Sequence, residues 1–357
     1  ELYNATDAPV DLSGLSISDG GGSFTVGSTA YIGGGSYAVL AARNISSDNG
    51  AIPKVDYRYY YSDFALGSTD IITVAGSGGT IDSVSYALGS TFPAASGKSI
   101  SLGSLDAGDN DSGNSWCVSL STYGDGDLGT PGSANDACSV LSSLATLSIG
   151  DLVVSEIMHA PAQAAYNKGE WFEIYNASGS AANLYGLSVS DDGSDSFTVD
   201  RHLAVAAGGY AVLAARDSAA DNGGLPSVDF RYYYDDFSLE ASDEITLSRG
   251  ESTLDSVSYS TAAGFPETSG ESMTLGSLDS VLNDSAGHWC AATSSYGDGD
   301  LGTPGSANDA CPELAELSSL SPGDLVISEI MHAPAQTVYY KGEWFEIYNA
   351  SGSAANL

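Results

Sequence analysis

The chain has 357 residues, too many for one ordinary β-sandwich and enough for two or three modules. Apolar residues make up 42% of it, which excludes global disorder. Ten Lys and Arg against 46 Asp and Glu give a net charge of −36, which disfavours binding to nucleic acids and anionic membranes. The same charge suits cation binding or solubility in salt.

The chain begins in the middle of a motif that recurs. Glu1-Leu2-Tyr3-Asn4 returns at residues 173–176 and 346–349 with one conservative change, and other segments recur at an offset of 173. The longest match is between residues 151–184 and 324–357, which differ at four of 34 positions. Such a period indicates a tandem array. We expect the sequence, with neither initiator Met nor signal peptide, to be part of a longer protein.

The repeat divides the chain into modules and connectors. We predict an incomplete first module (1–138), a complete second module (151–311) and the opening strands of a third (324–357), with connectors at 139–150 and 312–323. The third part carries the two opening segments that the first module lacks. It either begins another module of a long chain or donates strands to the next subunit. The donor side chains would be Leu325, Ile327, Ile330, Trp344 and Ile347.

Short strands with period-two alternation are predicted throughout the second module. In residues 169–175, Phe172 and Ile174 share one face, whereas Trp171 and Glu173 share the other, and such strands look half buried. Turns rich in Gly and Asp separate the strands, which predicts an all-β sandwich or barrel. The other predicted strands are Ser196–Val199, Tyr210–Ala215, Glu244–Leu247 and Ser256–Tyr259.

The connectors carry leucines three residues apart, which places the leucines on one side of a helical turn or polyproline-type segment. We expect them to dock on neighbouring modules and to make the array semi-rigid. The leucines are Leu141, Leu144 and Leu147, and Leu314, Leu317 and Leu320.

Five segments of the chain together carry a recognisable pattern, residues 153–158, 169–176, 183–187, 208–213 and 302–308. They resemble the lamin tail domain family in its bacterial secreted form. The resemblance implies tandem immunoglobulin-like β-sandwich modules with an accessory, non-catalytic role in secreted nucleases and surface proteins, and it supplies no catalytic residues. The module is longer than the usual domain, chiefly around residues 217–285.

Each module has two cysteines 21 residues apart, Cys117 with Cys138 and Cys290 with Cys311. An even number of cysteines in an acidic repeat of secreted type indicates disulfides within each module. A zinc site is the alternative, but two cysteines without a nearby pair of histidines do not supply four ligands.

Two groups of carboxylates are candidate calcium ligands. Asp125 and Asp127, and their repeats Asp298 and Asp300, alternate with glycines in a loop, where several oxygens can converge on a hard cation. The alternative is a solvated turn in which each Asp caps its own backbone. Glu156 and Glu173 lie in predicted strands, and a buried carboxylate needs a partner, either a cation or backbone N–H groups.

Tyrosines cluster in two equivalent triplets that each follow an arginine. Consecutive strand residues point to opposite faces, so at least one ring of each triplet should face outward. Exposed Tyr is favoured at interfaces, and the alternative is a ring at the sandwich rim. The interface candidates are Tyr59, Tyr60 and Tyr61, and Tyr232, Tyr233 and Tyr234.

These features together predict a non-catalytic structural repeat of an extracellular surface filament. Its partners would be further copies of itself, and the sequence shows no catalytic constellation. One alternative is a calcium-stiffened adhesin that recognises glycans or a cell surface. Another is the accessory region of a secreted nuclease.

Overall fold

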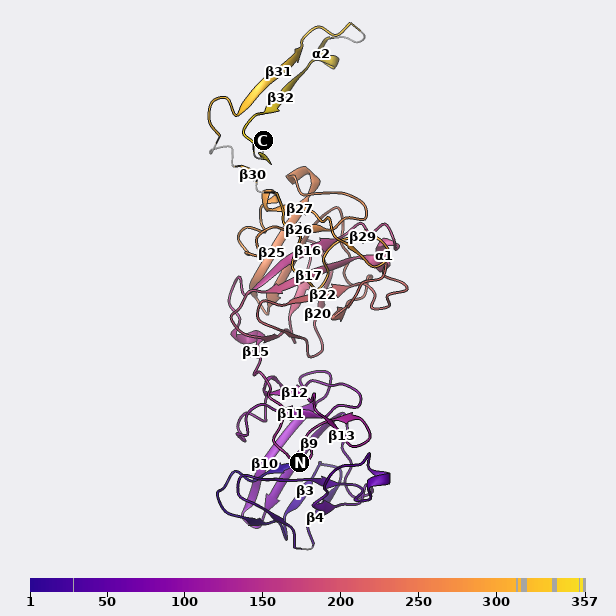
Figure 1. Cartoon of the computed structure of the whole chain (residues 1–357), viewed down its shortest axis with the longest axis vertical. Coiled ribbons are helices and arrows are strands. Elements are labelled where there is room, and N and C mark those ends of the chain that lie inside the picture. Colours follow the sequence, from indigo (N-terminus) through magenta and orange to yellow (C-terminus); the bar gives the residue numbers. More distant parts are fainter. Residues whose placement is uncertain (28, 313, 316–319, 336–338, 353, 356–357) are drawn as a thin grey trace.

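The computed structural model describes residues 1–27, 29–312, 314–315, 320–335, 339–352 and 354–355. In Figure 1 two β-rich modules follow one another, and a separate hairpin lies beyond them at the C-terminal end. The predicted all-β fold is confirmed. Across the described ranges, no helix is long and apolar enough to cross a membrane.

The second module contains most of the regular structure. Its strands are β15 (Ser142–Ser143), β16 (Leu152–Met158), β17 (Trp171–Asn176), β18 (Ala182–Asn183), β19 (Ser188–Ser190), β20 (Ser196–Thr198), β21 (Ala204–Val205), β22 (Tyr210–Ala214), β23 (Phe230–Arg231), β24 (Ser242–Arg249), β25 (Ser252–Ser260), β26 (Met273–Leu275), β27 (Trp289–Ala291), β28 (Ser295–Tyr296) and β29 (Asp300–Leu301). Its helical turns are η3 (Leu144–Thr146), α1 (Tyr166–Gly169), η4 (Thr261–Ala263) and η5 (Ala286–His288).

These strands form a sandwich of two main sheets. One sheet has the order β23-β22-β17-β16-β26-β27 and the other β20-β19-β24-β25. Between them, Phe172 and Ile174 pack in one apolar cluster with Leu213, Ile245 and Val257, as the alternation of the sequence predicts.

The outer face of the six-stranded sheet is also buried. The sequence instead predicts half-buried strands, in which one of the two faces is exposed. Trp171 and Val212 pack there against Leu225 and Tyr296, which come from a loop and from β28. The indole Nε1 of Trp171 donates to the Tyr296 hydroxyl at 2.9 Å. Every residue of β16 is buried because segments distant in sequence cover this second face.

In the first module the smaller sheet is complete, whereas the larger sheet is interrupted. Its elements are β1 (Leu2–Tyr3), β2 (Val10–Asp11), β3 (Ser16–Ser18), β4 (Ser23–Thr25), β5 (Tyr31–Ile32), β6 (Tyr37–Ala38), β7 (Leu40–Ala41), η1 (Ser46–Asp48), β8 (Tyr57–Arg58), β9 (Thr69–Gly76), β10 (Gly79–Ala87), β11 (Ile100–Leu102), η2 (Gly113–Ser115), β12 (Trp116–Val118), β13 (Thr122–Tyr123) and β14 (Asp127–Leu128). The sheet β10-β9-β3-β4 is complete, whereas β1-β6, β7-β8 and β11-β12 are separate pairs. The larger sheet is divided because this module lacks the counterparts of β16 and most of β17.

The C-terminal part repeats the opening hairpin of the second module. Its elements are β30 (Leu314–Ala315), β31 (Leu325–Met331), α2 (Tyr339–Gly342), β32 (Trp344–Asn349) and β33 (Ala354–Ala355). Ile330 lies opposite Phe345 in this hairpin, as Ile157 lies opposite Phe172 in β16 and β17.

The first connector docks on the module that follows it. Leu144 and Leu147 are buried in the core of the second module, as the leucine spacing predicts. β15 adds a parallel pair to β18. The Arg249 guanidinium also donates to the carbonyl oxygens of Leu144 and Leu147, at 3.2 and 2.9 Å. In the second connector Leu317 lies outside the described residues, and β30 pairs with β33 in the same parallel manner.

Candidate functional site

The hairpin β16–β17 lies at the centre of the larger sheet of the second module. β16 pairs with β17 and β26, and β17 pairs with β22, so the hairpin joins both halves of the sheet. Ile157 faces Phe172 on one side and Met273 on the other. The sandwich therefore depends on this hairpin, and it is the piece that the first module lacks.

Two carboxylates of this hairpin are buried and bonded to protein donors. Glu156 accepts hydrogen bonds from the Ser272 hydroxyl and from the backbone N–H and hydroxyl of Thr303. Glu173 accepts from the backbone N–H of Gly305 at 2.7 Å. Burial raises the pKa of both groups, that of Glu173 to about 8. The closing segment 303–305 is thus anchored on the opening hairpin.

The glycine-rich aspartate loops differ between the two modules. Asp300 is buried, and its carboxylate accepts from the backbone N–H groups of Ala162 and Gln163 at 3.1 to 3.3 Å. Its counterpart Asp127 is exposed, because the segment corresponding to residues 162–163 is absent from the first module. Asp125 and Asp298 are exposed. Asp300 therefore caps the backbone of residues 162–163 and joins that segment to its own loop.

One group of three acidic residues within the described ranges has oxygens close enough for a cation. Oxygens of Asp191, Asp192 and Asp243 lie within 4.8 Å of one another. Asp243 already accepts from two backbone N–H groups, and Asp191 from the N–H of Gly193. The sequence predicts that the loop residues Asp191 and Asp192 are exposed and do not bind a cation. Asp192 is exposed in the structure.

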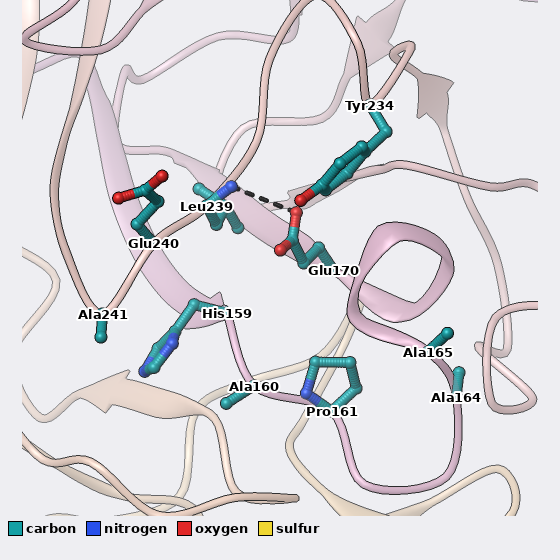
Figure 2. A pocket seen from close by; sticks show the side chains of 10 residues that line it. All are labelled: His159, Ala160, Pro161, Ala164, Ala165, Glu170, Tyr234, Leu239, Glu240 and Ala241. Atoms are coloured by element: carbon teal, nitrogen blue, oxygen red, sulfur yellow. Dashed lines mark hydrogen bonds between the residues drawn. The ribbon is translucent and has the colours of Figure 1, made fainter.

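A cavity of about 560 Å³ opens beside a third buried carboxylate, Glu170 (Figure 2). One carboxylate oxygen accepts from the backbone N–H of Leu239 at 3.1 Å. The other has no hydrogen-bond partner within the described part of the chain. Burial raises the pKa of Glu170 to about 8 and lowers the pKa of the nearby His159 imidazole. In Figure 2, His159, Pro161 and Tyr234 surround this carboxylate.

The tyrosine triplets divide between core and surface. Tyr232 is buried and stacks on Phe197, with ring centroids 5.2 Å apart, and Tyr234 lines the cavity beside Glu170. Tyr233 is exposed beneath the guanidinium of Arg231, 5.0 Å from the ring centroid. In the first module Tyr59 is partly buried, whereas Tyr60 and Tyr61 are exposed. Each triplet therefore has outward rings, and their role in an interface stays a prediction.

Both expected disulfides are present. Cys117 is bonded to Cys138, and Cys290 to Cys311. Cys117 lies on β12 and Cys290 on β27, so each bond ties the last strand of its sheet to the C-terminal tail of its module. The bonds close loops of 21 residues, a length that contributes roughly 3 kcal/mol in the chain-entropy account.

The predicted donor residues form the exposed hairpin β31–β32. Ile327, Ile330, Trp344 and Ile347 are exposed, and Leu325 is partly buried. The structure leaves this hairpin paired with itself alone among the described residues.

Polar residues that organise the second module were missed by sequence reasoning. Asp255 accepts from the backbone N–H of Val154, and the amide of Asn308 donates to the carbonyls of Ser155 and Leu275. The signal that could have found both residues is their recurrence, 173 residues earlier, as Asp82 and Asn135.

The comparisons with known proteins agree with this architecture. Residues 145–261 match the Lamin Tail Domain family. This range begins in the connector and ends in η4, so β26 to β29 and the segment 302–308 lie beyond it. No curated protein and no solved structure matches the chain. The second module, an immunoglobulin-like β-sandwich, is thus identified as a lamin tail domain over the matched residues 145–261.

Proposed function

We propose that the chain is a non-catalytic structural segment of an extracellular filament, in which lamin tail modules follow one another as a semi-rigid array. The docked connector is the observation that carries this proposal. Because Leu144 and Leu147 are buried in the second module, the junction has little freedom to swing. The net charge of −36 keeps such an array soluble, and the disulfides suit an oxidising, extracellular location.

A direct contact between the modules supports the same proposal. The Asn183 side-chain amide donates to the Asn114 side-chain oxygen at 2.8 Å, and the backbone N–H of Leu141 donates to the Asn114 carbonyl at 2.9 Å. Asn114 belongs to the first module and Asn183 to the second. Hydrogen bonds therefore connect the first module both to the connector and to the second module. A longer array with similar junctions would form an extended fibre.

Replacing Arg249 with alanine is expected to loosen this junction. A hydrogen bond from a charged group contributes about 1.5–3 kcal/mol, so the backbone N–H of Ser142, which donates to the Ala181 carbonyl, should exchange with deuterium about tenfold faster or more. Small-angle scattering should show a wider spread of shapes. Arg43→Ala removes the same charge away from the connector and serves as the control. Unchanged exchange in Arg249→Ala would contradict the proposed rigidity.

A calcium-stiffened adhesin is the second candidate function, with glycans or a cell surface as partner. The exposed Arg–Tyr stacks favour it, with the guanidinium of Arg58 4.5 Å from the centroid of the Tyr60 ring and the similar pair at Arg231 and Tyr233. An accessory role in a secreted nuclease needs a catalytic domain outside residues 1–357.

EDTA should leave the melting temperature of the chain unchanged. Asp300, Glu156 and Glu173 already accept hydrogen bonds from protein donors, so their burial does not require a cation. Differential scanning calorimetry with EDTA and with added calcium checks this. A melting temperature that falls in EDTA and returns with calcium would support the second candidate. Asp298→Asn and Asp125→Asn would then tell which loop binds the ion.

A further inference from the structure

The cavity beside Glu170 lies wholly within the second module (Figure 2). One wall is the loop between β16 and α1, and the other is the segment between β23 and β24. The first wall is closely packed, because a Cβ added at Gly169 would lie 2.9 Å from the side chain of Pro161 and 2.8 Å from that of Ala164. A larger residue than glycine would displace the loop, so the shape of the cavity is built into the fold.

Glu170 lies at the inner end of this cavity with an incomplete set of hydrogen-bond partners. Its side chain is 0% exposed, and one carboxylate oxygen accepts from the backbone N–H of Leu239 at 3.1 Å. The other oxygen has no hydrogen-bond partner within the described part of the chain. Because a buried carboxylate oxygen without a partner is costly, the site favours a group that can donate a hydrogen bond to it.

The charges around Glu170 favour a cationic donor. Among the described residues that line the cavity there is no Lys or Arg, whereas the exposed Glu240 adds a second acidic group. Burial is the main cause of the raised pKa of Glu170, and the charges of Asp243 and Glu240 raise it further. A ligand with a positive charge would relieve this repulsion and hold Glu170 in its ionised form.

The other polar side chains of the cavity suit a ligand with several N–H groups. Burial lowers the pKa of His159, so at neutral pH one nitrogen of its imidazole can accept a hydrogen bond. In Figure 2 the Tyr234 hydroxyl lies beside the Glu170 carboxylate. A primary ammonium group has three N–H donors, so it can bind Glu170 and still donate to His159 or Tyr234.

A metal ion suits the cavity less well than an organic cation does. Among the described residues, the one group of acidic side chains whose oxygens lie within 4.8 Å of one another contains no residue that lines this cavity. One wall is apolar, with Ala160, Pro161, Ala164 and Ala165. Apolar walls favour a hydrocarbon chain, which an alkyl ammonium carries and a metal ion lacks.

We propose that this cavity binds a primary ammonium group carried on an aliphatic chain, with the Glu170 carboxylate as its counter-ion. A small alkyl amine and the lysine side chain of another protein present the same chemistry. Because Glu170 is fully buried, the ammonium reaches it when the side chain of Tyr234, which is only partly buried, rotates away. Binding at this cavity requires no second copy of the chain and no filament.

Proton NMR of the histidine rings tests this binding in the full chain. The chain has four histidines, so the imidazole signals are few, and the variant His159→Gln identifies the signal of His159. Adding n-hexylamine at neutral pH should shift the His159 signal in a saturable manner and leave those of His202 and His288 in place. n-Hexanol has the same chain and no charge, and it should bind about tenfold more weakly or less.

Two variants of the cavity separate its charge from its shape. Glu170→Gln keeps the shape of the side chain and removes its charge, and it should weaken the binding of hexylamine about tenfold or more. Ala165→Trp, at an exposed position of the wall, should block the cavity and abolish the shift without altering any charge. Glu251→Gln removes an exposed charge at the turn between β24 and β25 and should bind as the wild type does. Circular dichroism checks that each variant is folded.

A short peptide with a single lysine distinguishes the two sources of the ammonium group. A His159 shift with the peptide as well as with hexylamine assigns the cavity to the lysine side chain of a partner protein, and a shift with hexylamine alone assigns it to a small amine. The proposal is overturned by a His159 signal that does not move with hexylamine, by hexanol that binds as tightly as hexylamine, or by unchanged binding in either cavity variant.

Discussion

Replacing Phe172 with alanine is expected to lower the free energy of unfolding of the second module by about 3–5 kcal/mol. The Phe172 ring is fully buried and contacts Tyr232 and Phe237, with ring centroids about 6 Å apart. Its removal leaves a cavity between the two sheets that rigid strands cannot close. Urea denaturation followed by circular dichroism measures the change.

The chain supplies a matched control for this substitution. Phe345 occupies the equivalent position in β32 and is 63% exposed. In the monomer Phe345→Ala should change the unfolding free energy by less than about 0.5 kcal/mol. Similar losses for both variants would mean that the two hairpins are packed alike, contrary to the structure.

The second large effect is a loss of stability with rising pH. Burial raises the pKa of Glu170 to about 8, from its ordinary value of 4.5. Between pH 4.5 and about pH 8, the Glu170 carboxyl group therefore keeps its proton in the native state and loses it in the unfolded state. The free energy of unfolding should be highest below pH 4.5 and fall by a few kcal/mol, as an order of magnitude, as the pH rises to about 8. Glu173 acts in the same direction, since burial raises its pKa to about 8.

Glu170→Gln should remove the part of this slope that belongs to Glu170. The amide cannot ionise, and its oxygen can still accept from the backbone N–H of Leu239. The variant and the wild type should be about equally stable near pH 4.5, and the variant more stable above pH 8. Glu343→Gln, at the exposed equivalent position, should leave the curve unchanged. Chemical denaturation at a series of pH values measures both. A wild-type curve that rises from pH 5 to pH 8 would contradict this account.

The repeated architecture explains why one sequence can be packed in two ways. Residues 324–349 form the same hairpin register as residues 151–176, which shows that the alternation and the turn determine the hairpin locally. Burial of that hairpin is a property of its neighbours. In the second module β22 and β26 lie on either side of it, whereas the C-terminal copy has no such strands among the described residues.

The sequence by itself determined the elements that depend on short-range patterns. Local spacing predicts three features that the structure contains. They are the strand around Phe172, the disulfide between Cys290 and Cys311, and the docking of Leu144 and Leu147. The lamin tail resemblance belongs with these, since its opening motif is contiguous in the sequence.

Only the tertiary structure decided which polar side chains became buried and which groups form hydrogen bonds with them. Asp300 caps Ala162 from 138 residues away, and Glu156 meets Thr303 from 147 residues away. Nothing in the local pattern distinguishes Asp300 from the exposed Asp298. The physical reason is that burial depends on which distant segments cover a strand, and the sequence pattern describes only the two faces of the strand itself.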